Sequence, residues 1–275
     1  MELNNENYFS TEMQMKYMGA SSFKAFCKCE AAALAEIKGE YIRPKSTALL
    51  VGSYVDAHFE GTLDLFKAQN PELFKRDGSL KSEYIQAEQI INRIEQDELF
   101  MLLMSGKKQV IRTGTIAGIP FKIKIDSYID AATCKTIADR FPDATEALGF
   151  LDGAIVDLKC MRDTAPIWID GIGKAPFVEA WGYDLQGAIY QAVEGNMLPF
   201  ILAVSTKEDE SGLNAFSISQ NDLDAKLMEV EELAPRFQAI KQGLIEPERC
   251  EDCAYCRKTR VLTRIIDYKE TMPNE

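Results

Sequence analysis

No apolar run in this sequence approaches the roughly 18–20 residues that a membrane-spanning helix needs. The first residues, "MELNNENYFSTEMQMKYMG", are polar and acidic, whereas a secretory signal peptide begins with a basic segment followed by an apolar one. We therefore expect a cytoplasmic protein that has no membrane partner.

The chain also has fewer basic than acidic residues. Against 43 Asp and Glu the chain has 31 Lys and Arg, a net charge of −12. This balance disfavours a protein that coats nucleic acid without specificity, because phosphate binding needs local positive charge. It does not exclude an enzyme that confines its basic residues to one channel.

The order of patterns along the 275 residues, 46% of them hydrophobic, predicts one α/β core with a helical N-terminal extension. Helical patterns at about 21–39, 46–59 and 81–106 precede a hairpin at 109–131 and a strand at 154–161. A helix at 175–196, strands at 200–206 and 213–219, and a helix at 221–244 interrupted near Pro235 follow. Residues 62–80 are expected to be irregular, and 132–152 are consistent with an insertion.

We divide the chain accordingly. Residues 1–20 are expected to form a poorly structured leader and 265–275 a C-terminal tail. Residues 21–264 are expected to form a single domain, with a helical part at 21–105, the core sheet and helices at 106–245, and a cysteine-containing tail at 246–264.

The strand "AIVDLKCM" places Asp157 and Lys159 on one face and apolar residues on the other, because alternate residues of a strand share a face. Such a pair alone is more often a solvated ion pair. In "FKIKIDSYID", however, Lys122, Lys124 and Asp126 share a face in the same way. Two neighbouring strands would then bring two carboxylates and several lysines together.

Two further segments carry candidate residues. In "YDLQGAIYQA", Tyr183, Gln186 and Tyr190 share one helical face, and a glutamine within a tyrosine stripe fits core packing poorly. The only histidine, His58, lies in "YVDAHFEG". A lone histidine is more often an ordinary residue than a ligand.

In this order, His58, Asp126, Asp157-x-Lys159 and Gln186-x3-Tyr190 resemble the PD-(D/E)-x-K nuclease superfamily, in particular its RecB-like and phage-type exonuclease branches. "FVEAWGYDLQGAIYQA" and "SSFKAFCKCEAAALAEIKGEY" are similar to the exodeoxyribonuclease VIII-like group of phages and prophages. The resemblance covers about residues 20–260. It implies a restriction-endonuclease-like core, with a mixed central sheet flanked by helices, and a Mg²⁺-dependent exodeoxyribonuclease acting on DNA in phage recombination or repair. The resemblance also implies a single-strand annealing recombination protein as a partner. It is compatible with an oligomer of this chain.

The resemblance also implies roles for these residues. Asp126 and Asp157 would bind Mg²⁺, and a nitrogen ligand from His58 would make Mn²⁺ a competent substitute. Lys159 would stabilise negative charge at the phosphate, and Gln186 and Tyr190 would position the lysine, the water or the DNA backbone. The gap between the two acids is longer than usual, which leaves Asp130 as a rival to Asp126.

A cysteine cluster, "RCEDCAYCRK", holds three of the seven cysteines: Cys250, Cys253 and Cys256. This spacing is typical of a metal site, which needs a fourth ligand from Cys29 or Cys27. Some RecB-like members hold an iron–sulfur cluster with one early and three late cysteines, and by that resemblance Cys29 fits better and a 4Fe–4S cluster is expected. Zinc and unligated thiols are the alternatives.

The basic residues that follow the cluster, Arg257, Lys258, Arg260 and Arg264, form either a solvated tail or a strip that contacts DNA phosphates.

Two other hypotheses compete with the nuclease. One is a nuclease-like module that binds DNA or a partner without cutting. The other is an acidic α/β protein in which the Asp157–Lys159 pair is only a salt bridge and the cysteines hold structural zinc.

Overall fold

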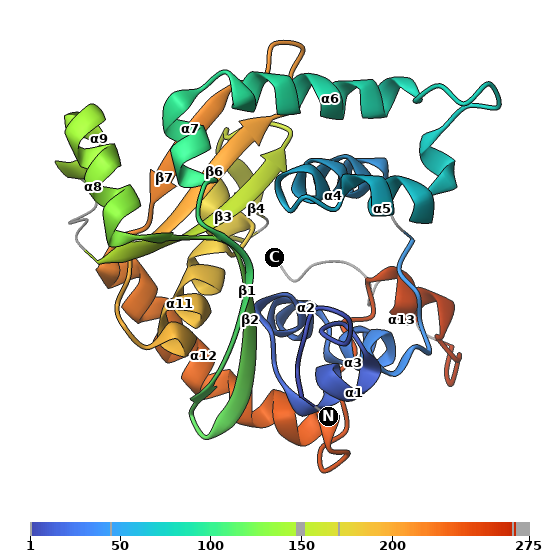
Figure 1. Cartoon of the computed structure of the whole chain (residues 1–275). Coiled ribbons are helices and arrows are strands. Elements are labelled where there is room, and N and C mark those ends of the chain that lie inside the picture. Colours follow the sequence, from blue (N-terminus) through green and yellow to red (C-terminus); the bar gives the residue numbers. More distant parts are fainter. Residues whose placement is uncertain (1, 45, 147–151, 170, 266, 268–275) are drawn as a thin grey trace.

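The chain folds around a five-stranded sheet with strand order β1-β2-β3-β6-β7 (Figure 1). A computed structural model describes residues 2–44, 46–146, 152–169, 171–265 and 267. The strands are β1 (Lys107–Ile116), β2 (Ile119–Asp130), β3 (Gly153–Met161), β6 (Phe200–Thr206) and β7 (Leu213–Ser217). The β1–β2–β3 meander and the β6–β7 pair are antiparallel, and β3 pairs with β6 in parallel. The predicted mixed α/β sheet is confirmed.

Helices cover both faces of this sheet. Those before and within the meander are α1 (Thr11–Lys16), α2 (Ala20–Lys28), α3 (Glu30–Lys38), α4 (Thr47–Phe59), α5 (Leu63–Gln69), η1 (Pro71–Leu73), α6 (Ser82–Glu95), α7 (Glu98–Leu103), α8 (Ala131–Arg140) and α9 (Pro142–Glu146). Those after it are α10 (Phe177–Ala180), α11 (Tyr183–Glu194), α12 (Gln220–Lys241) and α13 (Ala254–Lys258). A separate small hairpin consists of β4 (Ile167–Ile169) and β5 (Gly173–Ala175).

Strand β3 separates two hydrophobic cores because its side chains alternate. Ile155 packs in the core that α2, α11 and α12 cover, whereas Val156 and Leu158 pack in the core formed with α4, α6, α7 and α8 (Figure 1). Asp157 and Lys159 therefore point to the same side as Ile155, toward α11. The fold places the two candidate residues inside the protein and not on a solvated face.

The first twenty residues differ from the expected leader. Ser10 caps α1, and Met13 and Met18 are completely buried. Met18 also exchanges backbone hydrogen bonds with β2, donating to the carbonyl of Pro120 and accepting from the N–H of Lys122, each at 2.8 Å. The described part of this segment is thus ordered, because its methionines fill the core beside β2.

Other boundaries also differ from the predictions. The helix expected at 21–39 breaks at Cys29, whose backbone is extended (φ −167°). Pro235 lies inside a continuous α12, where burial of Val230, Ala234 and Phe237 against the core offsets the roughly 3 kcal/mol that an interior proline costs. Residues 131–146 form two short helices, while 147–151 and the C-terminal residues 266 and 268–275 lie outside the described residues.

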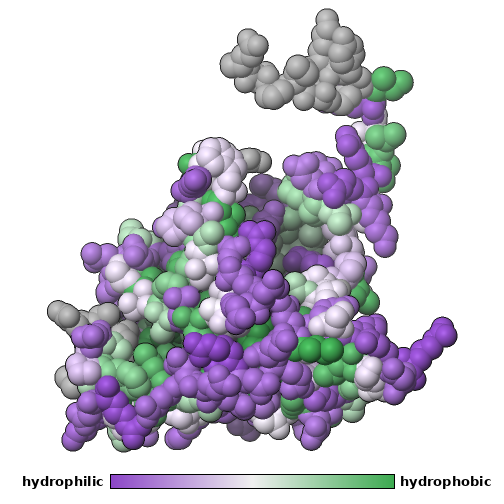
Figure 2. All heavy atoms as spheres, turned by 90° about the horizontal axis from the view of Figure 1, so that it is seen from above, coloured by the Kyte–Doolittle hydropathy of each residue, from purple (hydrophilic) through white to green (hydrophobic). Residues whose placement is uncertain are grey.

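One face of the molecule is mainly polar (Figure 2). Figure 2 shows a mostly hydrophilic face with scattered apolar side chains. Of the helices in the described ranges, none has the length and apolar character required to cross a bilayer.

Candidate active site

The two aspartates predicted from the strands lie side by side where β2 and β3 stop pairing. The last residue pair in the antiparallel register next to them is Ser127 with Val156, and the following positions are Asp126 and Asp157. Directly opposed residues of an antiparallel pair project to the same face. The backbone N–H of Leu158 donates to Asp126 Oδ2 at 3.0 Å, which fixes the Asp126 carboxylate against β3.

Asp157 is held from two sides. It is 2% exposed, and Gln186 Nε2 of α11 donates a hydrogen bond to its Oδ1 at 2.6 Å. Its other oxygen, Oδ2, forms an ion pair with Lys159 Nζ. The predicted acid–lysine pair is therefore a buried arrangement supported by a glutamine.

A third carboxylate, Asp56 of α4, lines the same cavity together with Glu60. Burial raises the pKa of Asp126 to about 7, and the negative charge of Asp157 adds to this effect. Burial and the nearby Asp126 likewise raise the pKa of Asp56 well above its ordinary value. Carboxylates that share a site in this way disfavour one another's ionised form, and a bound cation would relieve the repulsion.

The pKa of Lys159 responds in the opposite direction. Burial by itself would lower it, but the charges of Asp157 and Asp126 outweigh this effect and raise the pKa above its ordinary value. The Lys159 ammonium, which lies 5.4 Å from the centre of the Tyr183 ring, therefore stays protonated at neutral pH.

The cavity has a volume of about 730 Å³ and combines these acids with lysines from other elements. Lys122 and Lys124 of β2 and Lys24 of α2 all line it. Lys24 Nζ lies 3.4 Å from Gln186 Oε1, and burial together with the charge of Lys159 lowers its pKa to about 8. Helix α2 thus contributes a cation directly beside the carboxylate site.

His58 is not part of this cavity, which corrects its prediction as a metal ligand. Its Nε2 lies 2.8 Å from Glu95 Oε1 of α6, and the cavity lining from α4 includes Asp56 and Glu60 instead. Residues two apart on a helix point in different directions, whereas residues four apart share a face. The four-residue spacing of Asp56 and Glu60 is a sequence signal that could have indicated this face, but the sequence analysis did not use it.

Asp130 is also excluded from the site. It caps α8, accepting a hydrogen bond from the backbone N–H of Thr133 at 2.9 Å, and this bond lowers the pKa of its carboxyl. Of the two rival acids, only Asp126 lines the cavity.

The two residues predicted on α11 take separate positions. Gln186 contacts Asp157 and Lys24, as described, and so orients a carboxylate and not Lys159. The hydroxyl of Tyr190 donates to the carbonyl of Lys124 at 3.0 Å, which ties α11 to β2. Lys24 was missed because "SSFKAF" is a helix-forming segment with no motif of its own, and only packing brings it to α11.

The carboxylates fit a hard divalent cation. Three aspartates provide the oxygen ligands that Mg²⁺ prefers, and Mg²⁺ commonly retains several waters. Among the described residues, only four cysteines form a group of possible ligands that all lie within 4.8 Å of one another, and the three aspartates are outside that group. Asp56, Asp126 and Asp157 would hold a Mg²⁺ ion, and without His58 this set of residues includes no nitrogen ligand.

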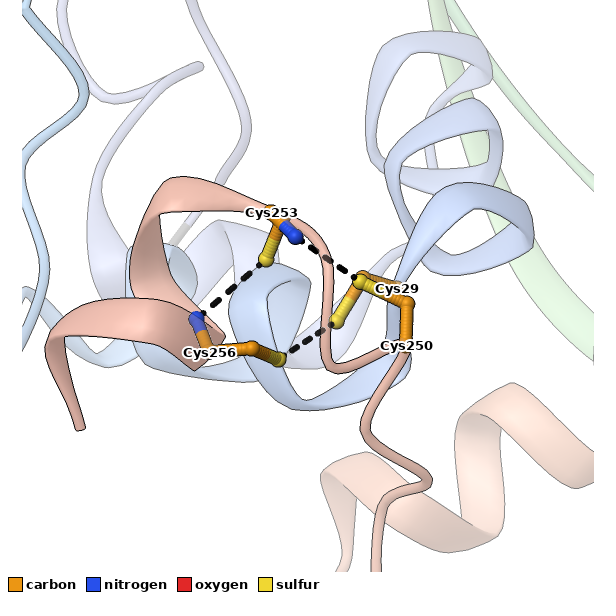
Figure 3. Close-up of side chains that lie close together, drawn as sticks. All are labelled: Cys29, Cys250, Cys253 and Cys256. Atoms are coloured by element: carbon orange, nitrogen blue, oxygen red, sulfur yellow. Dashed lines mark hydrogen bonds between the residues drawn. The ribbon is translucent and has the colours of Figure 1, made fainter. Parts of the chain in front are cut away.

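The cysteine group consists of Cys29, Cys250, Cys253 and Cys256 (Figure 3). Cys29 comes from the junction of α2 and α3, and the other three from the C-terminal segment. Cys27 is exposed and outside the group. The four residues can hold a metal, as their spacing predicted, with Cys29 as the fourth member.

The basic residues beyond the cluster are exposed. Arg257 and Lys258 end α13, and Arg260 follows it. None of the three lines the carboxylate cavity, so a DNA contact from them would lie outside it.

Comparison with known proteins assigns this chain to a family. Residues 19–141 and 148–259 match the family model described as "PDDEXK-like domain of unknown function (DUF3799)". The chain belongs to this PDDEXK-like family. A Eubacterium rectale protein, whose crystal structure is described as that of a "putative exonuclease", shares 42% sequence identity over 100% of both chains, with a TM-score of 0.88. No curated protein sequence matches the chain.

Membership confirms the PD-(D/E)-x-K superfamily and the restriction-endonuclease-like fold expected from the sequence. Asp157 and Lys159 of β3 and Asp126 of β2 remain the residues that we predict to form the motif of this domain. The match to the family model is interrupted at 142–147, inside the segment 132–152 that the sequence indicated as an insertion.

Proposed function

We propose that this PDDEXK-like protein is a Mg²⁺-dependent deoxyribonuclease, an exonuclease of the RecB-like, exodeoxyribonuclease VIII-like kind acting in phage recombination or repair. The observation that carries the proposal is the convergence of Asp56, Asp126, Asp157 and Lys159 in one cavity. The single strand left by end resection is the substrate that a single-strand annealing protein would take.

Each residue has a defined part in this reaction. Asp56, Asp126 and Asp157 would hold the divalent ion, which when bound activates water and neutralises charge on the phosphate. Gln186 keeps Asp157 in place through Oδ1 and leaves Oδ2 directed at Lys159. The Lys159 ammonium would stabilise the negative charge that develops on the phosphate as the bond breaks.

The DNA backbone would be bound by lysines that the fold gathers at the cavity. Lys24, Lys122 and Lys124 come from α2 and β2 and lie on the lining beside the acids. They supply local positive charge that the overall balance of −12 conceals. Arg257, Lys258 and Arg260 would add phosphate contacts outside the cavity.

The test compares cleavage of linear duplex and covalently closed circular DNA with Mg²⁺, with Mn²⁺ and without a divalent ion. An exonuclease degrades the linear form and leaves the circle intact. Asp157→Ala and Lys159→Ala should each reduce cleavage by about 100-fold or more, because each removes a group from the low-dielectric reaction centre. His58→Gln is the matched control, and it should cleave at the rate of the wild type because His58 contacts Glu95 outside the cavity.

Two outcomes would overturn the proposal. Cleavage that survives in both Asp157→Ala and Lys159→Ala would remove this mechanism. Tight DNA binding by the wild type without turnover in either metal would favour the competing hypothesis of a nuclease-like binding module.

A further inference from the structure

The four cysteine sulfurs are too close together for the iron–sulfur cluster expected from the family resemblance. All four Sγ atoms lie within 4.8 Å of one another, and those of Cys29 and Cys256 are 3.6 Å apart. Each cysteine of a 4Fe–4S cluster binds a different iron atom, so the cluster core keeps the four sulfurs well separated. The observed group leaves no room for such a core.

The spacing matches one tetrahedral ion instead. Zn–S bonds of about 2.3 Å place the sulfurs of a tetrahedral site about 3.8 Å apart, close to the Cys29–Cys256 distance. We propose that Cys29, Cys250, Cys253 and Cys256 bind a single Zn²⁺ as a structural tetrathiolate site, in place of an iron–sulfur cluster.

Hydrogen bonds within the C-terminal segment suit this ligand set (Figure 3). The backbone N–H of Cys253 donates to Cys250 Sγ at 3.3 Å, and the N–H of Cys256 donates to Cys253 Sγ at 3.4 Å. Bonds of this kind stabilise negative charge on sulfur, and a closed set of four thiolates is the usual form of a structural zinc site.

Contacts that do not involve sulfur hold the two segments in register. The N–H of Ala31 donates to the carbonyl of Glu248 at 3.0 Å. Arg236 of α12 bridges Glu30, at 2.6 and 2.9 Å, and Glu248, at 2.9 Å. The backbone on both sides of the cluster is therefore positioned by these bonds, so the sulfur spacing follows from the fold.

The zinc site would clasp the two ends of the domain together. Cys29 ends α2, and α2 carries Lys24 into the carboxylate cavity. The other three ligands belong to the segment that leads to Arg257 and Lys258 (Figure 1). The ion thus fixes the C-terminal end of the helix that delivers Lys24, and it anchors the basic segment beside α3.

The experiment measures metal content on the full chain purified anaerobically, separately from any nuclease assay. We expect about one zinc per chain, no iron and no visible iron–sulfur absorption. Incubation with ferrous iron and sulfide, followed by desalting, should leave no bound cluster. Replacement of zinc by Co²⁺ should give the visible spectrum of a tetrahedral cobalt tetrathiolate.

Cysteine variants connect the ion to these residues. Cys256→Ser should lose most of the zinc, and trypsin should then cleave faster within the segment that contains Arg257 and Lys258. Cys27→Ser is the matched control, and it should keep both the zinc and the resistance to trypsin because Cys27 is exposed and lies outside the group. If Cys256→Ser does not fold, the metal content, spectrum and reconstitution of the wild type still decide the question.

Iron with acid-labile sulfide, retained at cluster stoichiometry, would overturn the proposal, as would a chain that binds no metal. Zinc retained fully in a folded Cys256→Ser would exclude the site. None of these results depends on nuclease activity, so failure of the zinc proposal and failure of the proposed function are distinguishable.

Discussion

Asp126→Asn should stabilise the protein in the absence of divalent ions, and increasingly so as the pH rises. The substitution keeps an oxygen that can accept the hydrogen bond from Leu158 and removes the charge. In the wild type, the pKa of Asp126 is raised from 3.8 to about 7 by burial and by Asp157. A carboxyl group whose pKa is raised on folding favours the folded state less as the pH rises from its unfolded pKa to its folded one.

The size of the effect follows from this pKa. One pKa unit corresponds to about 1.4 kcal/mol, so between about pH 5 and about pH 7 the wild type should lose up to about 3 kcal/mol relative to the variant. This is an upper value, because Asp126 lines a cavity that admits water. The loss levels off about one pH unit above the folded pKa and stays constant at higher pH.

The assay is urea unfolding of both proteins at about pH 5 and about pH 8 in Mg²⁺-free buffer, without a chelator that would strip the cysteine site. Mg²⁺ at about 100 times its Kd should then stabilise the wild type by about 2.7 kcal/mol, and the variant far less. Asp130→Asn is the matched control at the end of the same strand. Since the pKa of Asp130 is lowered, its charge stabilises the fold at high pH, and its removal should not help there.

A variant that is no more stable than the wild type at pH 8, or whose advantage does not grow from pH 5, would refute the reasoning. It would mean that Asp126 is ionised and fully compensated by Lys159 in the metal-free protein, so that the carboxylates do not form a strained cation site.

Two further substitutions test the packing and the charge around the site. Gly187→Ala should destabilise the protein by about 1–3 kcal/mol, because a Cβ there would lie 2.8 Å from Phe200 Cδ1 and 2.9 Å from Leu223 Cδ2. Gly52→Ala is the control, because a Cβ at that position has nothing within 4 Å, and it should stabilise the protein by up to about 1 kcal/mol. Urea unfolding of both variants measures these changes. Lys24→Met should weaken DNA binding. It should also reduce the slope of the logarithm of the binding constant against the logarithm of the salt concentration by about 1, the equivalent of one phosphate contact. With a pKa of about 8, Lys24 loses its proton as the pH rises past that value, so binding by the wild type should approach that of the variant at high pH. An unchanged salt slope in fluorescence anisotropy titrations would show that Lys24 does not contact phosphate.

The half of the candidate site on the strands was predictable because a strand has a strict period of two. Asp157 and Lys159 must share a face, and so must Lys124 and Asp126, wherever the strands pack. The residues that the helices contribute to the site were harder to predict, since several faces of a helix carry polar residues. On α4 the choice between His58 and Asp56 depended on which face turned toward β3, and packing against α6 decided it.

The sequence by itself determined the order of the five sheet strands and of the longer helices, the acid–x–lysine pair on β3 and the metal-binding spacing of Cys250, Cys253 and Cys256, because these depend on periodicity and local spacing. It did not predict the short elements α1, α5, α8, α9, β4 and β5. Only the tertiary structure decided that Lys24 reaches Gln186, that Asp56 joins the two strand acids, and that Cys29 completes a group of four closely spaced sulfurs. Those contacts join residues far apart along the chain. Their geometry arises from the packing of whole elements, which no local pattern encodes.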